Sequence, residues 1–401
     1  MIQFFMTVKS IFKKFISWPL LAHIVIAIVL AILSSLFFPT WLSRVFVTIN
    51  SIFSNFLGFI IPLLIVGLVA PGISDLGNKA GKLLFITVLI AYISTCISGY
   101  MSYGTCRLVY PYILSGTTLD GDLNANLELL PYFTIEMKPI MDVTSSLVLA
   151  FVLGLAIASV NAKATKSVLD EFKDIIMMVI SKVIIPLLPL FIYGIFLKLS
   201  VEGMVVNVIG IFIKIIAVIF VMHIFLLLFQ FIIAGAYSGK NPFKAPWNMM
   251  PAYMTALGTQ SSAATIPITL RQTKMNGVSD EVAEFQIPLC ATVHLAGSIL
   301  KIVASCYAIS MLLGMPTDIG LYSEFILMLG LTMVAAPGVP GGAIMAALAL
   351  ISGTLGFDSQ MQGIVIAIYI SIDSFGTAAN VTGDGAIALI IDKISKKNEQ
   401  R

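Results

Sequence analysis

Residues 373–384 read DSFGTAANVTGD and lie inside a long apolar segment near the C-terminus. This stretch carries two carboxylates, Asp373 and Asp384, together with Thr377 and Asn380. Spacings of four, three and four residues place these side chains on one face of an α-helix. An ionised carboxylate in the hydrocarbon region of a bilayer costs at least about 2.5 kcal/mol. If the segment crosses a membrane, its polar face is therefore expected to be functional.

The composition of the chain predicts an all-α integral membrane protein. Of its 401 residues 59% are hydrophobic and only 11% are charged, and the mean hydropathy is +1.02. A spanning helix needs about 20 mostly apolar residues. Six stretches before residue 240 meet that length: 19–38, 53–69, 83–101, 143–160, 175–199 and 205–234. The net charge of +3 is spread over short loops, which gives no support for a nucleic-acid partner.

Lysines in the loops predict the orientation of the chain. Lys9, Lys13 and Lys14 precede an apolar stretch without a cleavage motif, so we expect a retained signal anchor. With the N-terminus in the cytoplasm, most other loop cations fall on that side: Lys79, Lys82, Lys163, Lys166, Lys173, Lys240, Lys244, Lys393, Lys396, Lys397 and Arg401. A minority falls opposite: Arg44, Arg107, Lys138 and Lys198. The positive-inside rule then predicts an even number of spans and two cytoplasmic termini.

Beyond residue 240 the apolar stretches are interrupted at mid-length. Residues 254–270 (MTALGTQSSAATIPITL) and residues 326–350, interrupted by AAPGVPGG at 335–342, predict two re-entrant helical hairpins. Residues 284–302, interrupted by CATVHLAGS at 290–298, predict a span with an unwound middle. The final segment, 364–391, is expected to be one apolar helix with a polar face. Irregular backbone at membrane depth is tolerated only where it is buried in protein or lines a cavity. The pattern indicates a binding site at the midplane, as in secondary transporters.

We accordingly divide the chain into two parts. Residues 1–240 form a six-span region that serves mainly as scaffold, and its third and sixth spans are expected to pack with the rest. Residues 241–401 form a transport core. Neither Asp373 nor Asp384 has a lysine or arginine within two turns of its own helix, so both are expected to need an external cation. The alternative is a buried hydrogen-bond network that braces the bundle.

Four segments in this order resemble the signature segments of the dicarboxylate/amino acid:cation symporters, the glutamate-transporter homologues. They are TQSSAATIPIT (259–269), PLCATVHLAGS (288–298), AAPGVPGGAIM (335–345) and DSFGTAANVTGD (373–384). The resemblance extends over the whole chain in length and span pattern. It implies eight transmembrane helices plus two re-entrant hairpins, a homotrimer, and a mobile domain that slides across the membrane against a fixed scaffold.

The resemblance also implies roles for individual residues. Asp373 matches the acid that binds the α-ammonium group of the substrate, and Asn380 matches the amide that holds its α-carboxylate. The other implied substrate-binding positions are Ser261 and Ser262 at the first hairpin tip, Gly338, Val339, Pro340 and Gly341 at the second, and Ser298, Gly376 and Thr377.

Gly376 departs from the family members that carry acidic substrates, which have an arginine at this position. Without a guanidinium, a buried side-chain carboxylate would lose its partner. The sequence therefore predicts a small neutral amino acid such as serine, threonine or alanine. Glycine is also expected to enlarge the pocket, so a larger neutral side chain is not excluded. An acidic amino acid or dicarboxylate is kept as an alternative.

The residues implied for the coupling cation are Asp384, Asn380, His294 and Cys290. In the NMDGT-like motif of the family, this chain has His294 for the asparagine and Ala296 for the aspartate. Asp384 and nearby backbone oxygens suit a hard cation, so sodium is predicted. Histidine titrates near neutral pH, so proton coupling through His294 is the alternative. A third interpretation makes His294 a packing residue.

Other function classes find less support. No nucleophile–base motif and no HExxH motif occurs, and the four cysteines lack metal-ligand spacing, so we predict neither an enzyme nor an organic cofactor. A channel is an alternative, but two hairpins around an acid-bearing site suit alternating access better. The predicted location is the bacterial inner membrane, with membrane lipids around the spans. The sequence does not identify the amino acid or the cation stoichiometry.

Overall fold

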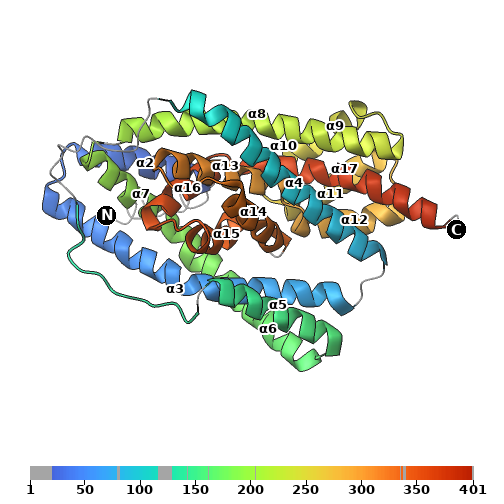
Figure 1. Ribbon diagram of the computed structural model, residues 1–401, viewed down its shortest axis with the longest axis horizontal. Helices are drawn as coiled ribbons and strands as arrows, with labels where there is room; N and C mark the ends of the chain where they lie inside the picture. The colour runs from blue at the N-terminus through green and yellow to red at the C-terminus, as the bar shows by residue number, and fades with distance from the viewer. Residues whose placement is uncertain are drawn as a thin grey trace, which may run out of the picture.

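The computed structural model describes residues 20–78, 82–115, 129–141, 143–160, 162–203, 205–334, 336 and 340–399. Within these residues every regular element is a helix, and the molecule is an elongated bundle of long helices (Figure 1). The N-terminal lysines and the hairpin residues Gly338 and Val339 lie outside the described residues.

All six predicted N-terminal spans coincide with helices. They are α2 (Leu20–Ser35), α3 (Thr40–Asn78), α4 (Lys82–Ile113), α5 (Val143–Val160), a continuous rod made of α6 (Lys163–Val179), η1 (Ile180–Ile184) and α7 (Ile185–Val201), and α8 (Val205–Ser238). In the described part of the chain, five helices are long and apolar enough to cross a membrane, or six if one bent pair is a single span. The predicted total of eight spans thus stays a prediction, whereas the polytopic all-α architecture is confirmed.

Two pairs of short helices lie where the sequence predicts hairpins. After the single turn of α9 (Lys244–Asn248), α10 (Met250–Thr259) packs on α11 (Ser262–Met275), and α14 (Ile319–Val334) packs on α15 (Gly342–Gly353). The first turn is possible because Gln260 adopts a left-handed conformation with φ of 53°, which closes α10. Gly341 has φ of 73° and begins the second return helix, a conformation that favours glycine.

Two further helix pairs are each interrupted by a break of one or two residues. α12 (Asp280–Val293) and α13 (Ala296–Leu312) are separated at His294 and Leu295, as predicted. The expectation of one unbroken final helix is wrong. α16 (Ser359–Ser371) and α17 (Asp373–Glu399) meet at Ile372 with a bend of 62°. The break makes Asp373 the first residue of α17, where the positive end of the helix dipole favours a carboxylate.

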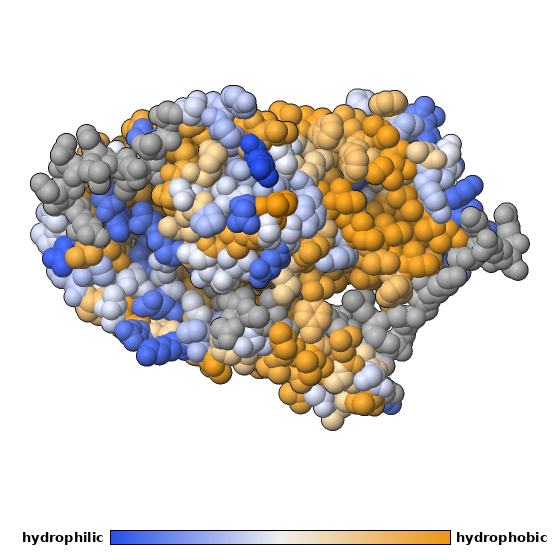
Figure 2. Space-filling view, viewed as in Figure 1, coloured by the Kyte–Doolittle hydropathy of each residue, from blue (hydrophilic) through white to orange (hydrophobic). Residues whose placement is uncertain are grey.

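The helices pack in two groups. α3 packs on α5, α6 and α7, and α2 packs on α7. The other group is formed around α13 and α17, which contact α4, α8, α10, α11 and α12 (Figure 1). Helices α15 and α16 lie between the groups and contact α2, α3 and α7. Figure 2 shows hydrophobic side chains over much of the outer face near α4 and α8, as a lipid-facing surface requires.

Candidate functional site

The predicted polar face of α17 exists and is buried. Asp373, Thr377, Asn380 and Asp384 all lie in this one helix and are each at most 7% exposed. The Thr377 hydroxyl donates to the backbone oxygen of Asp373 at 3.0 Å, so it is satisfied within the helix. The two carboxylates at either end of the face form two separate clusters, one around Asp373 and one around Asp384.

The Asp373 carboxylate is paired within the chain. Its Oδ1 accepts from the Lys301 Nζ at 2.9 Å, and its Oδ2 accepts from the backbone N–H of Gly341 at 2.9 Å. Lys301 is fully buried in α13, and its ammonium lies 3.6 Å from the centre of the Tyr369 ring. The expectation that Asp373 lacks an internal partner is therefore wrong. The lysine comes from a neighbouring helix, which the inspection of one helix does not reveal.

Gly376 does not enlarge the pocket, contrary to the expectation. A Cβ atom at this position would lie 2.5 Å from both Cε and Nζ of Lys301. The lysine side chain thus occupies the space beside the glycine. This arrangement places a cation near the position at which acidic-substrate relatives were expected to have their arginine.

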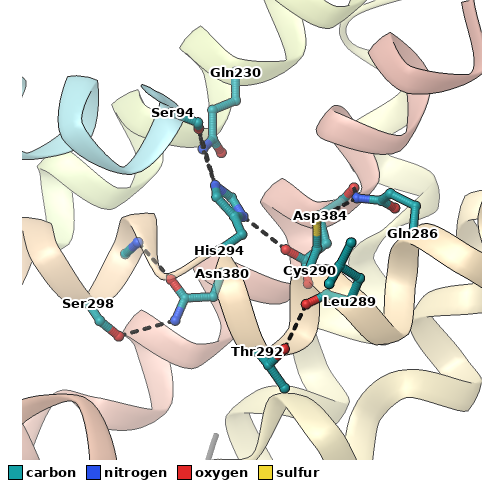
Figure 3. A network of polar contacts seen from close by, with 11 residues as sticks. Ser94, Gln230, Gln286, Leu289, Cys290, Thr292, His294, Ser298, Asn380 and Asp384 are labelled. Carbon is teal, nitrogen blue, oxygen red and sulfur yellow. Dashed lines mark hydrogen bonds and ion pairs between the residues drawn. The ribbon is translucent and has the colours of Figure 1, made fainter. Parts of the chain in front are cut away.

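The first turn of α13, directly after the break, holds Asn380 in place (Figure 3). The backbone N–H of Gly297 donates to the Asn380 Oδ1 at 2.7 Å, and the Asn380 Nδ2 donates to the Ser298 Oγ at 3.1 Å. The Tyr369 hydroxyl also donates to the Ser298 Oγ, at 3.2 Å. A ring nitrogen of His223 lies 3.1 Å from the Gly297 carbonyl oxygen. Ser298 and Asn380 are thus brought together as predicted.

Gly297 allows the close approach of α13 and α17. A Cβ there would lie 2.6 Å from the Gly376 carbonyl oxygen and 2.9 Å from the Ala379 Cβ. Backbone atoms yield little, so Gly297→Ala is expected to destabilise the protein by about 1–3 kcal/mol. The melting temperature of the purified protein in detergent measures this. The matched control is Gly210→Ala, because a Cβ atom at that helical glycine would meet no atom within 4 Å outside its own stretch of helix. Equal melting temperatures for both variants would contradict the packing argument.

The second cluster pairs Asp384 with His294. The Asp384 Oδ1 lies 2.9 Å from His294 Nδ1, and both side chains are buried. The other ring nitrogen, Nε2, lies 3.1 Å from the Ser94 Oγ and 3.4 Å from the Gln230 Nε2 (Figure 3). Ser94 comes from α4, Gln230 from α8, His294 from the break after α12 and Asp384 from α17, so four parts of the chain meet here. Both residues also line a cavity of about 160 Å³ between α4, α8 and α17.

Several oxygens of this cluster have capacity for a further ligand. Among the described residues, the Asp384 Oδ2 and the side-chain oxygens of Gln230 and Gln286 are buried without a hydrogen-bond partner. Cys290 lies nearby, but its sulfur accepts from the Gln286 Nε2 at 2.8 Å and its carbonyl accepts from the His294 N–H. The described residues contain no group of three His, Cys, Asp or Glu side chains suited to a metal. A hard cation here would need oxygen ligands beyond Asp384.

The predicted hairpin residues lie next to α11, which packs on α17, and next to α15, which packs on α13. Ser261 caps α11 by accepting from the Ala264 N–H at 3.3 Å, and Ser262 is buried in the first turn of α11, which packs on α17. Pro340 and Gly341 precede α15, and Gly341 contacts Asp373 directly. Among the described residues of the second predicted hairpin tip, Gly341 is therefore the one that contacts the Asp373 carboxylate.

Sequence reasoning missed five residues of the site. They are Ser94, His223, Gln230, Lys301 and Tyr369. The signal for Lys301 was present, because a lysine in an apolar span is by default a candidate functional residue. The same signal applied to His223 in α8, whereas Ser94, Gln230 and Tyr369 are polar residues that only the packing of their helices brings to the site.

Comparisons with known proteins agree with the four motifs. The model of the sodium:dicarboxylate symporter family matches residues 20–394. The serine/threonine transporter SstT of Acinetobacter baylyi is 25% identical over 96% of this chain and 100% of its own length. The excitatory amino acid transporter 3 of Mus musculus is 31% identical over 39% of this chain and 30% of its own length. The excitatory amino acid transporter 2 of Rattus norvegicus is 28% identical over 65% of this chain and 46% of its own length.

Proposed function

The chain belongs to the sodium:dicarboxylate symporter family, and we propose that it takes up a small neutral amino acid together with sodium ions. Family and relatives make it a multi-pass membrane protein of the cation-coupled amino-acid symporter type. The observation that carries the finer proposal is Asp373, a buried carboxylate held between a broken span and the second hairpin. In the proposed complex Asp373 binds the substrate ammonium and Asn380 the α-carboxylate.

Two observations support a neutral side chain. The last helix has Gly376 where an arginine is expected in acidic-substrate members, and a relative that is similar over nearly the whole chain is a serine/threonine transporter by name. Serine, threonine and alanine are accordingly the proposed substrates. The second candidate is an acidic amino acid or dicarboxylate. It is favoured by the ammonium of Lys301, which lies beside Gly376 and offers a partner to a second carboxylate.

Sodium is the proposed coupling ion. Asp384 has one carboxylate oxygen engaged with His294 and one that is unpartnered among the described residues. Carboxylate and carbonyl oxygens are the ligands that hard cations prefer. The alternative is a proton carried by His294, because an imidazolium at that place would neutralise Asp384 without any metal ion.

The proposed mechanism is of the elevator type within a homotrimer, in the bacterial inner membrane with both termini cytoplasmic. Helices α4 and α8 are assigned to the moving part together with residues 241–401. Hydrogen bonds support the assignment of α4, because Ser98 and Ser102 donate to the carbonyl oxygens of Ala296 and Leu300 in α13. The rest of residues 1–240 would form the scaffold and the trimer contacts.

Counterflow in proteoliposomes tests the proposed function. Vesicles loaded with unlabelled serine are expected to accumulate radiolabelled serine, threonine and alanine in sodium buffer, because alternating access exchanges substrate across the membrane. Accumulation of aspartate in preference to serine would favour the second candidate. If none of these amino acids is exchanged, the symporter proposal fails. A substrate-independent leak would instead indicate a channel.

A further inference from the structure

We infer that Lys301 is a substrate-binding residue, whose ammonium leaves Asp373 and pairs with a carboxylate of the bound amino acid. This inference rests on the proposed function, because it adds a residue to the same site. It starts from one observation: the carboxylate proposed to receive the substrate ammonium already holds an ammonium, at 2.9 Å. A substrate ammonium at Asp373 would lie beside the like-charged Lys301 ammonium, so we expect Lys301 Nζ to move away when the substrate binds.

The displaced lysine needs a new partner. Lys301 is 0% exposed, and its ammonium has the Asp373 carboxylate and the face of Tyr369 as neighbours. The ring alone compensates a buried charge poorly, and an unpaired buried charge strongly disfavours a complex. An amine without a carboxylate would therefore exchange one buried ion pair for another and leave Lys301 unpaired. Such a ligand is expected to bind weakly.

A zwitterion removes this difficulty. Its ammonium can take the place of Lys301 on Asp373 while its carboxylate receives the lysine, so every buried charge stays paired. Each charge then keeps an opposite charge within hydrogen-bond distance. Hydrogen bonds between charged groups are stronger than those between neutral groups, and a low dielectric strengthens them further. The Asp373–Lys301 pair is thus complementary to an amino acid as a class, and less so to simple amines.

The geometry allows the lysine to make this exchange. Lys301 follows Ser298 by three residues, so both side chains lie on one face of α13. Ser298 bonds to Asn380, the residue proposed to hold the α-carboxylate. The ammonium therefore has a substrate carboxylate within reach on the Asn380 side. On the other side it lies against Gly376, where a side-chain carboxylate would point.

The experiment compares acids with their amides on the purified full-length protein. L-serine and L-serinamide differ only in the α-carboxylate, and L-aspartate and L-asparagine differ only in the side-chain carboxylate. Calorimetric titration of all four in sodium buffer gives two acid-over-amide affinity ratios. In Lys301→Met, one of the two ratios is expected to fall by about 30-fold or more, the scale for removing one partner of a buried charge pair. The ratio that falls identifies the carboxylate that Lys301 binds.

The ratio separates this role from simple competition. If Lys301 merely blocked Asp373, its removal would raise the affinity for acid and amide alike, and both ratios would stay as in wild type. Unchanged ratios would overturn the inference about Lys301. A wild-type protein that binds none of the four ligands would overturn the proposed function as well. Lys198→Met is the matched control, a lysine of α7 paired with Glu202, and should leave both ratios unchanged. If Lys301→Met does not assemble, Lys301→Gln replaces it, because glutamine keeps a donor for Asp373 but carries no charge.

Discussion

Replacing Asp373 with asparagine is expected to reduce amino-acid uptake to background. The carboxylate is the proposed anchor for the substrate ammonium, and an amide offers it no opposite charge. The change also leaves Lys301 buried beside the Tyr369 ring without an anion. Breaking a buried pair in this way costs about 3–5 kcal/mol of stability. Uptake in proteoliposomes and the melting temperature of the purified protein are the two measurements.

A double variant separates transport from folding. Asp373→Asn combined with Lys301→Met buries no unpaired charge, so most of the lost stability is expected to return. Uptake is expected to stay at background, because the ammonium anchor is still absent. Wild-type uptake by Asp373→Asn alone would refute the assignment of this residue. Uptake recovered together with stability in the double variant would show that the single change acts only on folding.

Replacing Asp384 with asparagine is expected to abolish sodium-driven uptake. Asp384 is the carboxylate of the second cluster, and its removal leaves no negative charge there to compensate a cation. Substrate uptake driven by an inward sodium gradient, compared at equal pH on both sides, measures the effect. The control variant is Asp392→Asn near the end of α17, whose carboxylate bonds to Ser279 and Lys396 instead.

His294→Asn identifies the ion. If sodium couples, wild-type uptake needs sodium, and an inward pH gradient does not replace it. Two results together would make the sodium assignment wrong. Wild-type uptake would be undiminished in sodium-free buffer and would increase with an inward pH gradient, and the His294→Asn variant would no longer respond to that gradient. That pair of results would make the His294–Asp384 pair the carrier of a proton.

Much of the fold was predictable because the bilayer restricts the chain to helices. Apolar length located α2 to α8, and polar or bend-forming residues located both hairpins and the break at His294. The bend at Ile372 was missed because YISIDSF contains neither glycine nor proline. At the bend, Asp373 contacts Lys301 and Gly341, which come from other parts of the chain and cannot be found by reading this segment alone.

The site was predictable only along single helices. The spacing in residues 373–384 identified the polar face of α17, and the motifs identified Ser298 and His294. Lys301 meets Asp373 across 72 residues of sequence, and Ser94 meets His294 across 200. Such pairs depend on how helices pack, which periodicity within one helix does not encode. The neutral-substrate prediction rested on the absence of a cation at position 376, and Lys301 supplies one from another helix.

The hydrogen bonds from α4 to α13 have a consequence for biosynthesis. Ser98 and its acceptor, the Ala296 carbonyl, are 198 residues apart. At about 5–20 residues per second, a ribosome needs about 10–40 s to reach the partner. During that time α4 lies in the membrane with Ser98 and Ser102 lacking the carbonyls that they bond in the finished protein. The nascent chain must therefore keep α4 available for α13, and pausing or truncation before α13 would leave α4 as a target for membrane quality control.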